Sequence, residues 1–106
     1  MAQLESLLKL VGGARDGALL RYAIGTEMNK LGQHAEAEAH LRQALDWQPD
    51  YTAAWKLLGK TLVAQQQSEA ACTAYRRGIE VAEAHGDIQA AREMTVFLRR
   101  QEPPRV

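Results

Sequence analysis

A spacing of 34 residues is the feature of this sequence that most restricts how it can fold. Gly25 and Gly59 are separated by it, and each stands in a stretch rich in residues that favour helix. The same shift pairs residues of one chemical class at further positions: Ile24 with Leu58, Met28 with Leu62, Ala37 with Ala71, Leu41 with Tyr75 and Arg42 with Arg76. A period of this length indicates a helical repeat in which each unit stacks on its neighbour.

Breaker residues divide the chain into helices and leave no strand. Proline occurs only at 49, 103 and 104, and no segment alternates apolar and polar residues as a strand would. Apolar residues recur instead at helical spacing between glycines and polar clusters. The predicted helices cover about 2–12, 17–31, 35–47, 51–64, 68–84 or 85, and 87–100, followed by a disordered tail over 101–106.

Capping residues support these helix ends. We expect side-chain N-caps from Asp16, Asp50, Ser68 and Asp87, and helix stops at Gly32, Pro49 and Gly86. The last helix should bury one apolar stripe, formed by Ile88, Ala91, Met94 and Leu98.

The two units resemble the tetratricopeptide repeat, TPR, whose pattern is W-x₂-L-G-x₂-Y, then A-x₃-F, then P. The matching residues are Ile24-Gly25, Met28, Ala37, Leu41 and Pro49 in the first unit, and Trp55, Leu58-Gly59, Leu62, Ala71 and Tyr75 in the second. Small residues suit a close helix crossing, so Gly25 would meet Ala37 and Gly59 would meet Ala71. The resemblance implies an all-α fold of antiparallel helix pairs stacked as a short right-handed superhelix, a small stand-alone module of bacterial type.

The chain departs from the family pattern at two places. Arg21 stands where the family has Trp, and we expect its stem to cover the core while its head reaches water. Glu83 replaces the second unit's proline, so the helix from Ser68 is expected to run to Ala84 or His85.

The predicted organisation is a single domain over 1–106. It comprises a lead-in helix (about 2–12), unit one (about 18–51), unit two (about 52–85) and a capping helix (about 87–100) that echoes the start of a second helix. An unrelated antiparallel helical bundle is the alternative, since loops this short would permit it as well.

Each repeat unit consists of a first and a second helix. By the same resemblance, outward residues of the first helices line a concave groove that binds ligands. They are Leu19, Tyr22, Thr26 and Asn29 in unit one, and Ala53, Lys56, Lys60 and Val63 in unit two. This mixture suits an extended or helical peptide of acidic character, although the two lysines could equally be solvated helix lysines. The clamp that holds chaperone C-termini in some TPR domains is not matched, because Tyr22, Thr26 and Leu57 occupy its positions and a third first helix is not expected.

The sequence predicts neither an enzyme nor a cofactor or metal site. His34 and Glu38 could share a metal, but two ligands do not make a site, and His40 lies on another face. His85 is expected to cap the C-terminal end of a helix, where its imidazolium would favour the carbonyl dipole. Cys72 is expected to be a partly buried, inert thiol. Thirteen basic residues balance thirteen acidic ones, so no bulk charge draws the chain to nucleic acid or a membrane.

The predicted function is therefore an adaptor or scaffold that binds a partner protein or peptide in its groove. The alternative is a self-associating homo-oligomer, because two units are fewer than the ~3 usually needed for stability. The lead-in helix over 4–11 would then complete the stack within the chain or pack against a second copy. With no signal peptide and no membrane-length apolar stretch, the expected location is cytoplasmic. Arg92, Arg99 and Arg100 form a basic edge on the last helix, interpreted as a solvated face.

Overall fold

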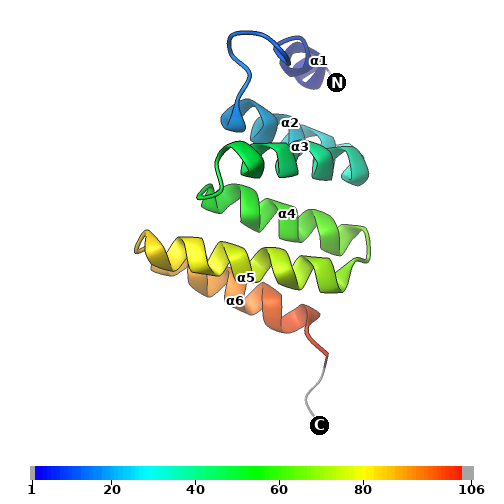
Figure 1. Ribbon diagram of the computed structural model, residues 1–106. Coiled ribbons are helices and arrows are strands. Elements are labelled where there is room, and N and C mark those ends of the chain that lie inside the picture. Colours follow the sequence, from blue (N-terminus) through cyan, green and yellow to red (C-terminus); the bar gives the residue numbers. More distant parts are fainter. Residues whose placement is uncertain (1, 104–106) are drawn as a thin grey trace.

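The computed structural model describes residues 2–103 and shows six α-helices and no strand within them (Figure 1). The helices are α1 (Ala2–Leu8), α2 (Ala18–Lys30), α3 (His34–Trp47), α4 (Thr52–Ala64), α5 (Ser68–Ala84) and α6 (Ile88–Gln101). They stack into an elongated body of 49 × 29 × 19 Å. The all-α helical-repeat prediction is confirmed. None of the helices in this part of the chain is both long and apolar enough to cross a membrane.

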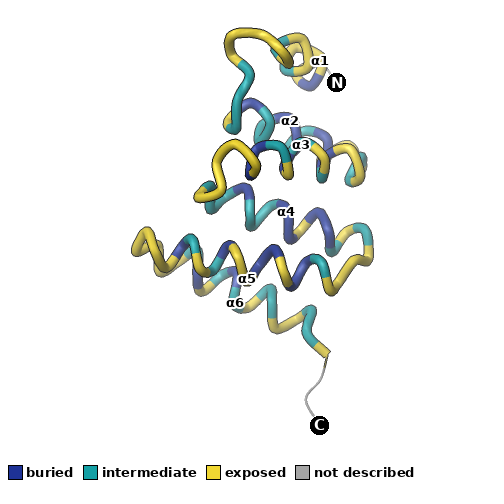
Figure 2. Tube along the Cα trace, in the orientation of Figure 1, coloured by how far each residue is buried: buried dark blue, intermediate teal, exposed yellow. Residues whose placement is uncertain are grey.

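The order of contacts repeats along the stack. Helix α3 packs on α2 and α5 packs on α4, while α4 also touches α2 and α6 also touches α4. Helix α6 therefore holds the place of a third first helix. This corrects the expectation that it echoes a second helix and that a third first helix is absent. Figure 2 shows the buried residues between successive layers, with exposed residues along the outside.

Helices α2 and α4 each provide a glycine at the close approach of the second helix that packs on them. A Cβ on Gly25 would lie 2.9 Å from Leu41 Cγ, and one on Gly59 would lie 2.6 Å from Tyr75 Cδ1. The principal partners of these glycines are thus the large residues Leu41 and Tyr75, rather than the predicted alanines. The large residues are buried, with Leu41 at 0% and Tyr75 at 2% exposure, and they fill the centre of each helix pair.

Only one of the four predicted side-chain N-caps forms. The Asp87 carboxylate accepts a hydrogen bond from the Ala90 N–H, as expected. Asp16, Asp50 and Ser68 do not cap, because the capping positions of α2, α4 and α5 fall on their neighbours Gly17, Tyr51 and Gln67. The Ser68 hydroxyl donates instead to Gln101 Oε1 on α6, at 3.2 Å.

The helices end close to the glycine, proline and polar residues predicted to stop them, except near the two ends of the chain. Helix α5 runs to Ala84, as the missing proline at Glu83 predicted. Helix α1 ends at Leu8, short of the predicted residue 12, because the N–H groups of Leu10 and Val11 bond to carbonyls three residues back and Gly12 has a φ of 82°. Gln101 belongs to α6 rather than to a disordered tail, and residues 104–106 of that predicted tail lie outside the described residues.

The apolar stripe predicted for α6 is wrong at one position. Ala91 and Met94 are buried and Leu98 is half-buried, but Ile88 is 63% exposed. Ile88 is the first residue of α6, at the end of the stack, and the described part of the chain has no helix beyond it.

Arg21 holds the lead-in segment against the first helix pair. Its Nε and Nη2 donate to the two Asp16 carboxylate oxygens at 2.9 Å each, and its guanidinium lies 5.2 Å from the Trp47 ring centroid. The Arg21 head is therefore paired and stacked, not directed to water as predicted. The hydrogen bond from Arg21, and a second from the Gly12 N–H, lower the pKa of Asp16 from 3.8 to about 2. Leu4 completes the attachment by packing, buried, against the apolar face of α2.

Candidate binding groove

The eight residues predicted to contact a ligand lie on α2 and α4, and α4 contacts both α2 and α6. Leu19 and Lys60 are exposed, and the other six are half-buried. We define this surface of α2, α4 and α6 as the groove. A side chain of the groove can contact a ligand only if it is not already engaged by other residues of the folded chain.

The α2 residues mostly stabilise the stack. The Tyr22 ring lies 5.1 Å from the Tyr51 ring, and the Thr26 hydroxyl donates to the Tyr22 carbonyl of its own helix. Burial, together with Tyr22, raises the pKa of Tyr51. Leu19, at 73% exposure, is the one α2 residue of the predicted set that is largely uncovered.

Asn29 links α2 to α4 through a chain of hydrogen bonds. Its Nδ2 donates to Thr61 Oγ1 at 2.8 Å, and Thr61 in turn donates to the Leu57 carbonyl. Its Oδ1 lies 2.8 Å from His34 Nδ1, which must then carry the proton. Thr61 is 1% exposed, so this network satisfies a buried hydroxyl. Asn29 therefore acts in packing, with both its amide atoms engaged.

Lys56 is paired across the groove. Its Nζ lies 3.6 Å from Glu93 Oε1 on α6. The two side chains line a hollow of about 320 Å³ together with Thr52, Ala53, Asp87, Gln89 and Ala90. Lys56 thus has an ion-pair partner on α6, and both side chains remain partly exposed.

Lys60, one turn along the same helix, meets an aromatic ring. Its Nζ lies 5.0 Å from the Phe97 ring centroid, and the Arg100 guanidinium lies 5.9 Å from the same centroid. Within residues 2–103 neither cation has a carboxylate within ion-pair distance. Val63, Tyr75 and Gln101 join these three in lining a hollow of about 180 Å³. Two cations beside an apolar ring can bind a ligand in which a carboxylate stands next to an apolar group, because the cations pair with the carboxylate and the ring contacts the apolar group.

The residues that α6 brings to the groove were missed from the sequence. Glu93 and Phe97 were not assigned, and Arg100 was placed on a solvated basic edge, because the last helix was expected to echo a second helix. A signal was present: Met94 and Leu98 match Leu58 and Leu62 in class, but two positions later than the 34-residue period requires. Helix α5 is longer than α3, and this extra length displaces the register.

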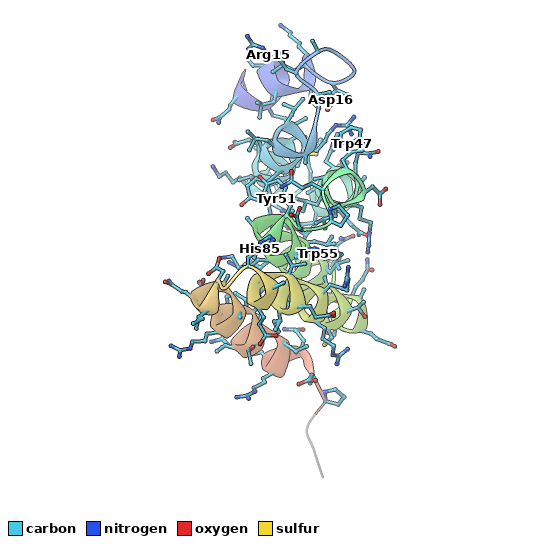
Figure 3. All side chains as sticks on the ribbon, turned by 60° about the vertical axis from the view of Figure 1, so that its left-hand side comes forward. Arg15, Asp16, Trp47, Tyr51, Trp55 and His85 are labelled. Carbon is cyan, nitrogen blue, oxygen red and sulfur yellow. The ribbon has the colours of Figure 1, made fainter. Side chains whose placement is uncertain are left out.

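Trp47 ends α3, Tyr51 precedes α4, and Trp55 lies in the first turn of α4. Figure 3 labels Asp16, Trp47, Tyr51 and Trp55 at successive levels of the stack. Trp55, predicted to point inward, is half-buried and donates from Nε1 to the Pro49 carbonyl at 2.8 Å.

The histidines and the cysteine have structural surroundings. His85 forms the C-cap of α5, with its Nε2 3.6 Å from Asp50 Oδ2, and the Arg21 guanidinium approaches His40 Nδ1 at 3.4 Å. Glu38 interacts with Arg42 and Gln65 rather than with His34. Cys72 is buried at 5% exposure. Across residues 2–103, no three His, Cys, Asp or Glu side chains converge on a point where a metal could bind.

Comparison with protein families and curated proteins gives one consistent family. Residues 29–94 match the family model described as the tetratricopeptide repeat. The TPR repeat-containing protein PA0015 of Pseudomonas aeruginosa is 40% identical over 97 residues, which cover 92% of this chain and 92% of that protein.

Solved structures agree with this. The solution structure of protein BPP2914 from Bordetella parapertussis superposes with a TM-score of 0.83 at 40% identity, covering 95% of this chain and 88% of that one. The solution structure of a tetratricopeptide repeat domain protein from Salinibacter ruber gives a TM-score of 0.76 at 26% identity, covering 82% and 88%.

Proposed function

Because the chain belongs to the tetratricopeptide repeat family, we propose that it is a non-catalytic interaction module that binds a peptide segment of a partner protein along the groove. Modules of this family are generally non-catalytic and typically bind proteins. The observation that carries the proposal for this chain concerns two cations, Lys60 and Arg100, which lie beside the Phe97 ring and have no carboxylate within ion-pair distance among residues 2–103.

The groove favours a peptide that carries an acidic residue next to an apolar one. A ligand carboxylate near Lys60 and Arg100 would form charge-assisted hydrogen bonds. An apolar neighbour would fill the hollow lined by Val63 and Phe97. In the α2 half, Leu19 offers a further apolar contact, while Asn29 and Thr26 act by holding the groove in shape.

The test replaces both of these cations, in the variant Lys60→Glu/Arg100→Glu. A matched control is Lys9→Glu/Arg15→Glu, which makes the same charge change on exposed residues at the opposite end of the stack. Lys56 is left intact, because glutamate there would face Glu93 and disturb the fold. Circular dichroism melting establishes that each variant folds.

The wild-type chain is used to capture partners from a lysate of the source organism, and mass spectrometry identifies them. Overlapping peptides of each captured protein then locate the bound segment. We expect an acidic segment whose affinity falls at least about tenfold with the groove variant and is unchanged with the control. A partner that binds the groove variant as tightly as the wild type would contradict the proposal.

Self-association is the alternative function predicted from the sequence. It would use the lead-in helix between two copies, but in the structure Leu4 of α1 packs on α2 of its own chain. Light scattering over a dilution series distinguishes the two, because the groove proposal needs only a monomer.

A further inference from the structure

The end of the stack formed by α6 has an exposed apolar surface distinct from the groove residues. Ile88 and Val96 are 63% and 47% exposed. They border a hollow of about 620 Å³ whose lining is Glu83, Gly86, Ile88, Ala91, Arg92, Thr95, Val96 and Arg99. We call this surface the end face. In Figure 1, α6 is the last helix of the stack, at the end opposite α1.

The repeat itself shows what kind of element fits the end face. Each earlier first helix is covered by a second helix: α3 packs on α2, and α5 packs on α4. Thr95 follows Met94 in α6 as Gly59 follows Leu58 in α4, and Gly59 is the place where α5 presses closest. The Thr95 hydroxyl donates to the Ala91 carbonyl at 2.7 Å, so it requires no polar partner from a docking helix. The end face is therefore the helix-docking surface of a unit whose second helix the described chain does not supply.

Charge indicates the character of the helix that docks. Arg92 and Arg99 are exposed, lie on one side of α6 two turns apart, and have no carboxylate within ion-pair distance among residues 2–103. Acidic residues on a docking helix would pair with them. Glu83 also lines the end face, so it and the two arginines together carry a net charge of +1. A second copy would bring the same net positive charge to this surface, and like charges oppose such pairing.

We propose that the end face binds an amphipathic helix of another protein, one that takes the place on α6 that α5 takes on α4. Its apolar seam would lie over Ile88, Ala91 and Val96, and its acidic residues would lie beside Arg92 and Arg99.

The end face adjoins the groove: in the register that aligns Thr95 with Gly59, Arg92, Val96 and Arg99 stand where Lys56, Lys60 and Val63 stand on α4. The two surfaces share no residue, so separate variants test them.

Synthetic helices test the proposal directly on the full-length chain. A fluorescent 17-residue peptide copies the apolar seam of α5, with alanine for Tyr75 because Thr95 is larger than Gly59. One version carries glutamate at the exposed flanking positions, and a matched version carries lysine there. Binding is measured by fluorescence anisotropy with wild type, with Arg92→Glu/Arg99→Glu, and with the equal-charge control Lys9→Glu/Arg15→Glu.

We expect wild type and control to prefer the glutamate peptide by at least about fivefold, and Arg92→Glu/Arg99→Glu to prefer the lysine peptide. Equal binding of the two peptides, equal loss in both double variants, or no binding of either peptide would overturn the proposal. So would sedimentation showing that the wild-type chain dimerises and that Arg92→Glu/Arg99→Glu does not, since a second copy would then cover the end face.

Discussion

Replacing Gly59 with alanine tests whether the close approach of α4 and α5 governs the stability of the stack. In the interior of a helix, alanine is ordinarily better than glycine by about 0.8–1.0 kcal/mol. The added Cβ, however, would meet the body of the Tyr75 ring, with Cδ1 and Cζ both at 2.6 Å. Tyr75 is 2% exposed and its ring centroid is 5.8 Å from that of Phe97, so it has little room to move.

The steric effect should outweigh the helix preference. Overpacking a well-filled core costs about 1–3 kcal/mol and occasionally more. Contacts of 2.6 Å with a ring place the cost in the upper half of that range, about 2–3 kcal/mol. After the gain from helix preference, we expect a net loss of about 1–2 kcal/mol in unfolding free energy, or roughly 4–16 °C in melting temperature. The equivalent change at Gly25 should cost less, because the shortest contacts there, 2.9 and 3.0 Å to Leu41, are longer than those at Gly59.

The assay is thermal and urea unfolding followed by circular dichroism for wild type, Gly59→Ala, Tyr75→Leu and the double variant. Leucine at 75 reproduces the pairing of the first unit, where Gly25 faces Leu41. The two substitutions should therefore couple by at least about 1 kcal/mol in a double-mutant cycle. Additive effects, or a Gly59→Ala variant that melts above wild type, would refute the reasoning.

Four further substitutions follow from particular contacts and backbone angles. Asp16→Asn removes a carboxylate whose pKa is lowered to about 2. A lowered pKa stabilises the folded state above the unfolded value of 3.8, so the wild type's greater unfolding free energy in urea should shrink as the pH falls from about 4 to about 2. A difference between the two proteins that stays constant with pH would contradict this. Thr61→Val leaves Asn29 Nδ2 without its acceptor and should cost about 1–2 kcal/mol in urea unfolding, whereas a neutral result would show the bond to be dispensable. Gln66 and Gly32 are equivalent loop residues with positive φ angles of 61° and 76°. Gln66→Gly should therefore raise the unfolding free energy by about 0.5–1 kcal/mol, and Gly32→Ala should lower it by a similar amount. Melting temperatures that move in the opposite directions would contradict the role of backbone strain.

The layered fold could be predicted because its determinants recur in the sequence. The pairs Gly25–Gly59 and Leu41–Tyr75 lie one period apart, and each large residue packs against the glycine of its own unit. The length of α5 was also predictable, since Glu83 replaces the proline that would have stopped it. These features depend on residue size and backbone chemistry within one helix pair, which a repeat pattern records directly.

Side-chain caps were harder to predict because distant partners compete for the same atoms. Asp16 precedes α2 as an N-cap would, yet a bidentate interaction with Arg21 holds its carboxylate. Ser68 begins α5, yet its hydroxyl donates to Gln101, 33 residues away. A local capping bond contributes about 1 kcal/mol, which a charged or long-range partner can match. Asp87 has no such competitor in the described chain, and it caps α6 as predicted.

In the groove, too, residues distant in the sequence determine which side chains have partners. Lys56 and Lys60 lie one turn apart on α4 and have similar sequence surroundings, but Glu93 pairs with the first and Phe97 lies beside the second. That difference originates in α6, whose register is displaced by the extra length of α5. A repeat pattern can therefore indicate which positions face a groove, whereas the charge that a ligand meets is determined by residues of the next layer. For this reason Lys60 and Arg100 come from two helices, and only the folded stack brings them to one ring.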